Sequence, residues 1–189
     1  LSRRQVFSDL WPILAYCDAD YAGELSTAKS TSGGLIKLSA DGAAIDWWSK
    51  KQEVVAGSTA EAEYISMYTC VNNTCSIQEL VMELELGIGR PRAVLMEDNT
   101  AAIALATGCR TGMRSKVRHM RVRFHKVRDC VREDNFQIVY CPTDRQTADV
   151  LTKAAGPQLM ASHLESLMGN TTGTGAALAC AALAHRVSE

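Results

Sequence analysis

Acidic residues stand at four places where the sequence predicts that a strand ends or a helix begins. Asp18 follows the apolar run of residues 11–16, and Asp98 follows a second apolar run. Glu63 lies in the first turns of a long predicted helix, and Asp149 lies near the start of a late one. Carboxylates are costly inside a core but are accommodated where a strand ends at the surface. If the strands that end at Asp18 and Asp98 are parallel neighbours, we expect their carboxylates to lie side by side.

Four converging carboxylates would favour metal-dependent chemistry. Like charges held together raise one another's pKa unless a cation lies between them. Mg²⁺ is the expected cation because it takes oxygen ligands, keeps several waters and binds beside phosphates, with Mn²⁺ as the alternative. A two-metal phosphoryl-transfer site needs such a set, with its ions roughly 3.5–4 Å apart. The ordinary alternative for Asp18 and Asp20 is a strand followed by an Asx-type turn at Ala22 and Gly23.

Glu61 and Glu63 compete for the helical ligand position. They are two residues apart, about 200° around a helix, so they cannot both face one site. Ser58 and Glu61 have the spacing of a capping box, which gives Glu61 a structural role at the helix start. Glu63 is therefore the predicted ligand.

The spacing of apolar residues predicts the elements that position these acids. Predicted strands cover residues 11–18, 33–38, 44–49, 92–99 and 136–141, and predicted helices cover residues 58–87, 100–106, 117–132, 146–153 and 158–168. Asn72 and Asn73 weaken the first helix, which leaves one helix or two open. Three strands joined by short turns form an antiparallel meander, and the alternation after it favours parallel strands. We expect an α/β fold with a mixed five-stranded sheet and helices on both faces.

Length and composition indicate one globular domain with extensions. The 189 residues are 47% hydrophobic and 22% charged, and no apolar run approaches the roughly 20 residues needed to span a bilayer. We expect an N-terminal extension at 1–13, a main domain at 14–155, and a C-terminal helix and Ala/Gly/Thr-rich tail at 156–189. The chain begins with Leu1, which indicates a piece of a longer product. Seven scattered cysteines without a zinc pattern predict reduced thiols in an intracellular protein, cytoplasmic or nuclear.

One predicted helix carries much of the positive charge. Nine of the 20 basic residues fall between Arg110 and Arg132, a window whose only acid is Asp129. Such a patch can attract a polyanion although the whole chain has a formal charge of −1. The candidate substrate-binding residues in this region are Arg114, Lys116, Arg118, His119, Arg121 and His125. A solvated cationic face is the alternative interpretation.

Six short motifs occur together in one order. They are YCDADYAG at 16–23, KSTSGG at 29–34, WSKKQ at 48–52, STAEAEYI at 58–65, EDNTAAIA at 97–104 and ADVLTK at 148–153. Together they resemble the ribonuclease H domain of copia-type retrotransposon polyproteins, over roughly residues 14–155. In the basic region, RHMRVRFH at 118–125 departs from the family's usual run by replacing its acidic residue with Arg121.

The resemblance implies a ribonuclease H-like fold with a catalytic and metal-binding quartet of Asp18, Glu63, Asp98 and Asp149. It implies hydrolysis of the RNA strand of RNA–DNA hybrids by two Mg²⁺ ions, leaving 3′-hydroxyl and 5′-phosphate ends. Asp18 would be shared by both ions, with Glu63 and Asp98 completing one and Asp149 the other. A reverse transcriptase domain of the same polyprotein is the implied partner, and a retroelement particle is the implied cytoplasmic setting.

Two other functions compete with this interpretation. The chain could be a domesticated, inactive fragment that serves as a structural or interaction subunit, which the over-basic helix and the alanine-rich tail would suit. The intact quartet argues against that role, because unused clustered acids are an electrostatic cost. An integrase or transposase shares the fold but fits the spacing of the acids poorly.

Overall fold

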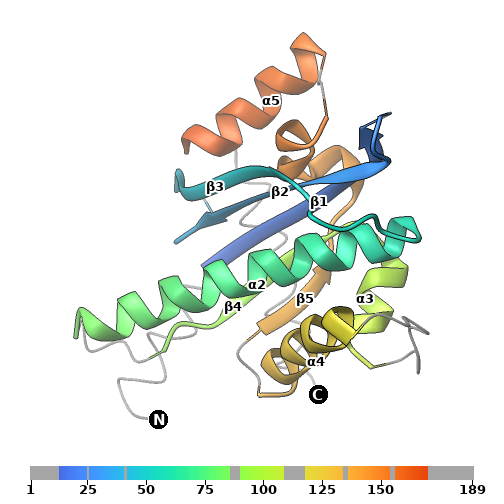
Figure 1. The fold of residues 1–189 in the computed structure, drawn as a ribbon. Coiled ribbons are helices and arrows are strands. Elements are labelled where there is room, and N and C mark those ends of the chain that lie inside the picture. Colours follow the sequence, from blue (N-terminus) through green and yellow to red (C-terminus); the bar gives the residue numbers. More distant parts are fainter. Residues whose placement is uncertain are drawn as a thin grey trace.

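A five-stranded mixed sheet forms the centre of the molecule (Figure 1). The computed structural model describes residues 13–24, 26–40, 42–85, 90–108, 118–133, 136–153 and 156–169. The strands are β1 (Ile13–Glu24), β2 (Lys29–Lys37), β3 (Ala44–Lys51), β4 (Ala93–Glu97) and β5 (Phe136–Tyr140). Their order in the sheet is β3-β2-β1-β4-β5, with β1, β2 and β3 antiparallel and β1, β4 and β5 parallel. The predicted meander and the predicted parallel pairing of the first and fourth strands are both confirmed.

Helices cover both faces of this sheet. The long α2 (Thr59–Glu83), the short α3 (Thr100–Ala106) and α4 (Arg118–Arg132) lie on one face (Figure 1). The 3₁₀ helices η1 (Thr143–Arg145) and η2 (Thr147–Leu151) lead to α5 (Pro157–Met168), and η2 and α5 pack on the other face. Within the described residues, no helix is both long and apolar enough to cross a membrane.

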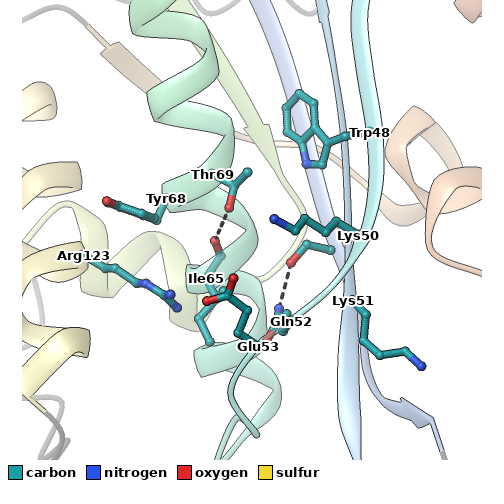
Figure 2. A pocket seen from close by; sticks show the side chains of 10 residues that line it. Trp48, Lys50, Lys51, Gln52, Glu53, Ile65, Tyr68, Thr69 and Arg123 are labelled. Carbon is teal, nitrogen blue, oxygen red and sulfur yellow. Dashed lines mark hydrogen bonds between the residues drawn. The ribbon is translucent and has the colours of Figure 1, made fainter.

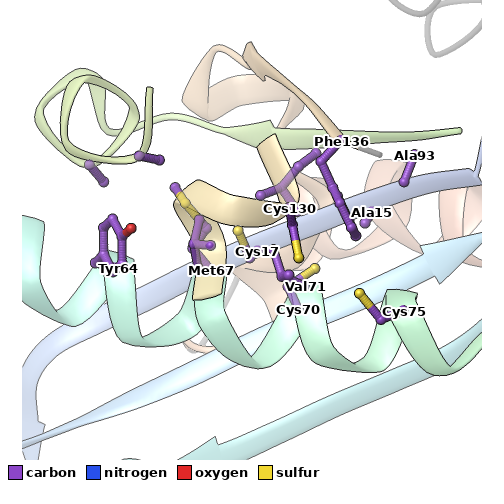
Figure 3. Packing of buried hydrophobic residues seen from close by; sticks show 14 of the residues in the cluster. Ala15, Cys17, Tyr64, Met67, Cys70, Val71, Cys75, Ala93, Cys130 and Phe136 are labelled. Atoms are coloured by element: carbon purple, nitrogen blue, oxygen red, sulfur yellow. The ribbon is translucent and has the colours of Figure 1, made fainter. Parts of the chain in front are cut away.

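Alternation along β1 divides the core into two layers. Ile13, Ala15 and Cys17 face α2, whereas Leu14 and Tyr16 face η2 and α5. Figure 3 shows the α2 layer, in which Met67, Cys70 and Val71 lie against Cys17 and Cys130. Because both faces of β1 are buried, its first seven residues are all buried and its register is firmly specified.

The first turn lies later in the chain than predicted. We predicted a turn at Ala22 and Gly23 and a turn-like stretch from 24 to 32, but β1 continues to Glu24 and β2 begins at Lys29. The register shifts between Asp20 and Glu24, and Ala22 takes the left-handed conformation with φ of 53°. The small residues therefore mark an irregularity inside the strand rather than its end.

Two helix predictions also change. The open choice at Asn72 and Asn73 resolves as one continuous helix, with Leu84 at its C-cap. Gly87, the predicted cap, lies outside the described residues. The predicted helix at 146–153 is a 3₁₀ segment, η2, whose start is capped by the side chain of Gln146.

Several sequence predictions fall on residues that the structure does not describe. They include the extension at residues 1–12, the loop at 110–115 and the tail beyond 169, so the domain limits stay predictions. The five cysteines in the described part of the chain, at positions 17, 70, 75, 130 and 141, are all buried and free.

Candidate active site

Three of the four predicted acids meet at the end of the sheet. Asp18 of β1, Glu63 of α2 and Asp98, directly after β4, each offer one carboxylate oxygen within 4.8 Å of the others. Asp18 and Glu63 are buried and Asp98 is half-buried. The site therefore combines two enclosed carboxylates with one that reaches the surface.

The start of α2 fixes Glu63 above the sheet. The Ser58 hydroxyl accepts a hydrogen bond of 3.2 Å from the Glu61 amide. Glu61 in turn accepts 3.0 Å from the Gly57 amide, one residue before the expected capping-box partner. Three residues after Glu63, the Ser66 hydroxyl donates a hydrogen bond of 2.7 Å to the carbonyl of Asp18, which ties the helix to the strand beside the site. Glu61 is thus occupied in capping, and Glu63 faces the other carboxylates, as predicted.

A buried glutamine holds open the gap in which the acids meet. The pairing of β1 with β4 stops at Tyr16 and Met96, two residues before Asp18 and Asp98. At that point Gln146 inserts its amide and donates to the carbonyls of Cys17 at 3.0 Å and Met96 at 3.3 Å. Gln146 was not predicted as a site residue, because a polar residue before a predicted helix carries no signal of a contact 129 residues away.

Asp98 is oriented by its neighbours on both sides. Thr143 of η1 donates a hydrogen bond of 2.9 Å to Asp98 Oδ2. Asn99 caps α3 by accepting 3.0 Å bonds from the amides of Ala101 and Ala102. The chain must therefore turn sharply at Asp98, which points its side chain out of the strand end.

Asp149 reaches the cluster through a lysine. Lys153 lies 2.9 Å from Asp149 Oδ1 and 3.6 Å from Asp18 Oδ2. The Thr152 hydroxyl also donates to Asp18 Oδ2. The described residues therefore show Asp149 linked to Asp18 through a cation, and not in the group of three oxygens formed by Asp18, Glu63 and Asp98.

A glycine gives η2 the space to approach β2. Gly33 lies opposite Asp18 in the sheet. A methyl group at Gly33 would lie 2.6 Å from Thr152 Cγ2 and 2.9 Å from Leu151 Cβ, closer than packed atoms allow. The close approach of Thr152 to Asp18 thus depends on a bare backbone at position 33.

The enclosed acids have strongly raised pKa values. Burial raises the pKa of Glu63 to about 10, with Glu97, Asp18 and Asp98 adding repulsion. Burial raises the pKa of Asp18 to about 6, although the Thr152 hydroxyl and Lys153 act in the opposite direction. Without a bound cation, Glu63 is therefore protonated at neutral pH.

Glu97 is a fifth acid at this site and was not among the predicted residues. Its side chain is fully buried, and burial raises its pKa well above the usual range. Its carboxyl group accepts 3.0 Å from the Asn99 amide and lies 3.3 Å from Cys17 Sγ. A carboxylate inside a predicted strand was a usable signal, because an acid at a core position is rarely buried without a partner or a function.

The donor set fits a divalent cation. Asp18 Oδ1 and Glu63 Oε2 are buried and have no hydrogen-bond partner among the described residues. Orphaned carboxylate oxygens that converge with a third carboxylate favour a hard cation with oxygen ligands, such as Mg²⁺. Asp18, Glu63 and Asp98 are the residues placed to hold it.

The predicted substrate-binding residues are only partly described. Arg114 and Lys116 lie outside the described residues, and Arg118 and His119 lie in the first turn of α4, where the side chains are not described. Arg121 and His125 are exposed on α4. The structure therefore leaves a contact between these residues and a substrate as a prediction.

The chain is similar in sequence to part of several known polyproteins. The chain is 36% identical over 143 residues to "Retrovirus-related Pol polyprotein from transposon TNT 1-94" of Nicotiana tabacum, covering 75% of this chain and 10% of that protein. It is 34% identical over 139 residues to the corresponding polyprotein from transposon RE1 of Arabidopsis thaliana, covering 74% of this chain and 9% of that protein. The chain thus spans about a tenth of the length of these relatives. No family model matches the chain.

Solved structures with the same fold are ribonucleases H. LC11-RNase H1, isolated from compost by a metagenomic approach, superposes with a TM-score of 0.57 at 16% identity, covering 76% of this chain and 94% of that one. The same protein in complex with an RNA/DNA hybrid gives a TM-score of 0.54, covering 76% and 95%. RNase H1 of Halobacterium salinarum gives 0.52 at 18% identity, covering 75% and 94%.

Proposed function

The chain is a relative of the copia-type retrotransposon Pol polyproteins and has the ribonuclease H fold, and we propose that it is an endonuclease that cuts the RNA strand of RNA–DNA hybrids. The observation that carries this proposal is the meeting of Asp18, Glu63 and Asp98 at the end of the sheet, with two buried oxygens that lack partners. Three buried or half-buried acids at one point are costly unless they bind a cation.

The four acids would divide the work of holding two Mg²⁺ ions. Bound there, the ions would lower the pKa of an attacking water and stabilise the leaving oxygen of the phosphodiester. Glu63 and Asp98 would complete one site with Asp18, and Asp149 would contribute to the other once Lys153 releases it. Thr152, Thr143 and Ser66 would keep the oxygens of Asp18 and Asp98 in position by the hydrogen bonds that they make.

The proposed substrate follows from the same relationship. A solved structure of similar fold is a complex with an RNA/DNA hybrid. The polyprotein relatives make a reverse transcriptase domain the proposed neighbour of this chain. Arg121 and His125, which are exposed on α4, would contact the phosphates of the bound hybrid.

A hybrid-cleavage assay tests the proposal. The wild type should cut the RNA strand of a labelled hybrid in Mg²⁺, leave 3′-hydroxyl and 5′-phosphate ends, and stop when EDTA is added. Asp98→Asn should lower the cleavage rate by more than about 100-fold. Losing a residue that only supports a metal ligand costs up to about 100-fold, and Asp98 is proposed to be a ligand itself. Asp129→Asn, at an exposed position of α4, is the matched control and should cut normally. Absence of cleavage by the wild type, or full activity of Asp98→Asn, would contradict the proposal.

A further inference from the structure

A pocket with a volume of about 120 Å³ lies beside the carboxylate cluster, between the end of β3 and the outer side of α2 (Figure 2). Trp48 and Lys50 of β3 lie on one side of it, and Tyr68 of α2 and Arg123 of α4 lie on the other (Figure 2). Gln52 and Ile65 contribute to its wall. None of these residues belongs to the proposed catalytic quartet.

The pocket is close to the carboxylates but distinct from them. Lys50 pairs with Ser32 in the sheet, and Ser32 pairs with Ala19, the residue after Asp18. Two strand spacings, about 10 Å, therefore separate Lys50 from the strand that carries Asp18. Ile65 follows Glu63 by two residues on α2 and turns toward the pocket. A nucleic-acid strand held at the carboxylates would reach the pocket within a few nucleotides, since successive nucleotides of one strand are about 3.4 Å apart along the helix axis.

Three polar atoms of pocket residues are buried and lack a partner among the described residues. They are the indole Nε1 of Trp48, Nη1 of Arg123 and Oε1 of Gln52. Buried polar groups in folded proteins are nearly always hydrogen-bonded, so three orphans in one pocket indicate a missing ligand. Two of the three are donors, which favours a ligand rich in acceptors. A water or a sugar hydroxyl beside that ligand would satisfy the third.

The charges of the pocket favour an anion. Lys51 is paired with Glu24, and Figure 2 shows it pointing away from the pocket. Lys50 points toward α2, and the guanidinium of Arg123 lies over the Tyr68 ring, 5.6 Å from its centroid. Glu53 is the acid among the lining residues, against the two cations Lys50 and Arg123. The balance is positive, and aromatic rings beside cations are typical of surfaces that bind nucleic-acid strands.

Gln52, in the wall of the pocket, is held in place by hydrogen bonds before any ligand binds. The Gln52 amide group donates to Ser32 Oγ at 2.8 Å and to the carbonyl of Ala62 at 2.9 Å. The Gln52 backbone amide donates 2.8 Å to the carbonyl of Ser30, which continues the sheet by one bond. The buried Oε1 of Gln52 is therefore already in place, and a side chain that is already held loses little entropy when a ligand binds.

We propose that this pocket binds a backbone phosphate of the nucleic acid whose scissile phosphate lies at the carboxylate cluster, with Trp48 Nε1, Arg123 and Lys50 as the donors. The inference rests on the proposed function for the identity of the nucleic acid. The pocket fixes the position of the strand relative to the cluster, and it takes no part in bond cleavage.

Binding of a fluorescein-labelled RNA–DNA hybrid to the full chain, followed by anisotropy in Mg²⁺, tests this inference. All variants carry Asp98→Asn so that the probe is not cut. The double variant Lys50→Ala/Arg123→Ala should raise the Kd about tenfold, since hydrogen bonds to charged groups are the strong ones. The slope of log Kd against log salt, between about 50 and about 200 mM, should fall by about 1, as expected for one lost phosphate contact. Arg132→Ala, exposed at the other end of α4, is the charge control.

Conservative substitutions of the adjacent Trp47 and Trp48 give a second test of hybrid binding. Trp48→Phe removes the indole donor but keeps an aromatic ring, and should raise the Kd about threefold to tenfold without changing the salt slope, because the lost donor is uncharged. Trp47→Phe, at a position that is 63% exposed, should bind the hybrid as the parent does. The inference would be overturned if both pocket variants bound the hybrid with a Kd within about twofold of these controls and the double variant kept the salt slope of its control.

Failure of the pocket and failure of the proposed function give different results. A wild type that cuts the hybrid while both pocket variants bind normally would refute only the pocket. Weakened binding by the pocket variants, with no cleavage by the wild type, would refute the nuclease proposal and support the pocket.

Discussion

Lys153 donates a hydrogen bond of 2.9 Å to the carboxylate of Asp149, four residues before it in the chain. The same ammonium lies 3.6 Å from Asp18 Oδ2. Burial lowers the pKa of Lys153, but Asp149 and Asp18 raise it by more, so the lysine is charged. It occupies the position between Asp18 and Asp149 where a second divalent ion would bind if Asp18 is shared. Lys153 therefore neutralises Asp18 and Asp149 in the absence of metal, and we propose that it would compete with that ion.

Removing this ammonium should strengthen metal binding. Lys153→Met should lower the Mg²⁺ concentration for half-maximal cleavage by about threefold to fivefold, a range set by the modest energy of a partly exposed ion pair. Mn²⁺ binding followed by electron paramagnetic resonance measures the same change without relying on activity. Lys126→Met, at an exposed position of α4, should leave both values unchanged. An unchanged or higher Mg²⁺ requirement for Lys153→Met would mean that the lysine does not compete with the ion.

The raised pKa of Glu63 predicts how stability depends on pH in the absence of metal. Its folded pKa of about 10 exceeds that of the unfolded chain, so the folded protein binds the proton more tightly. The stability that this proton provides is complete below about pH 4.5 and is lost progressively as the pH rises toward 10. Asp18 acts in the same direction between about pH 4 and pH 6. In EDTA, the melting temperature should therefore fall between pH 5 and pH 8.

Two comparisons isolate the carboxylate cluster as the cause. Mg²⁺ should raise the melting temperature more at pH 8 than at pH 5, because it replaces the proton that the acids otherwise need. Glu63→Gln should flatten the dependence on pH in EDTA and reduce the effect of Mg²⁺. A melting temperature that rises with pH in EDTA for the wild type would contradict the assignment.

Gly33 should be intolerant of any side chain. Gly33→Ala would place a methyl group against Thr152 and Leu151 and push η2 away from Asp18. We expect a loss of about 1–3 kcal/mol in the free energy of unfolding, the range for overpacking, together with a higher Mg²⁺ requirement. Gly156→Ala, where a methyl group meets nothing within 4 Å, is the matched control and should be neutral. Equal stability and metal requirement for the two variants would show that η2 can move without consequence.

The sequence carried enough signal to predict the sheet and the elements that bear the acids. Short apolar runs bounded by turn signals predicted all five strands, and a helical apolar stripe predicted the helix that carries Glu63, because the sheet is buried between two core layers. Asp98 does follow the end of β4, as predicted, whereas Asp18 lies inside β1, at the point where the pairing of β1 with β4 has already stopped.

The misses have physical causes that no local pattern records. Ala22 and Gly23 satisfied the rules for a turn, but pairing with β2 carried β1 past them to Glu24. Glu97 was not predicted as a site residue, because it lies within an apolar strand and next to Asp98, which follows that strand. Trp48, Gln52 and Arg123 meet only through the packing of β3, α2 and α4, so their pocket could not be predicted from spacing.

Gln146 provides the last test, because its side chain joins β1, which bears Asp18, to β4, which ends one residue before Asp98. Its amide is fully buried and donates to the carbonyls of Cys17 and Met96. Gln146→Leu keeps the volume but removes the amide that donates to both carbonyls, which should cost about 1–3 kcal/mol in urea unfolding. The strands should also shift relative to one another, so the Mg²⁺ requirement should rise. Arg145→Ala, its exposed neighbour, should stay within about 0.5 kcal/mol of the wild type. A Gln146→Leu protein with wild-type stability and metal requirement would show that the gap between β1 and β4 needs no bridge.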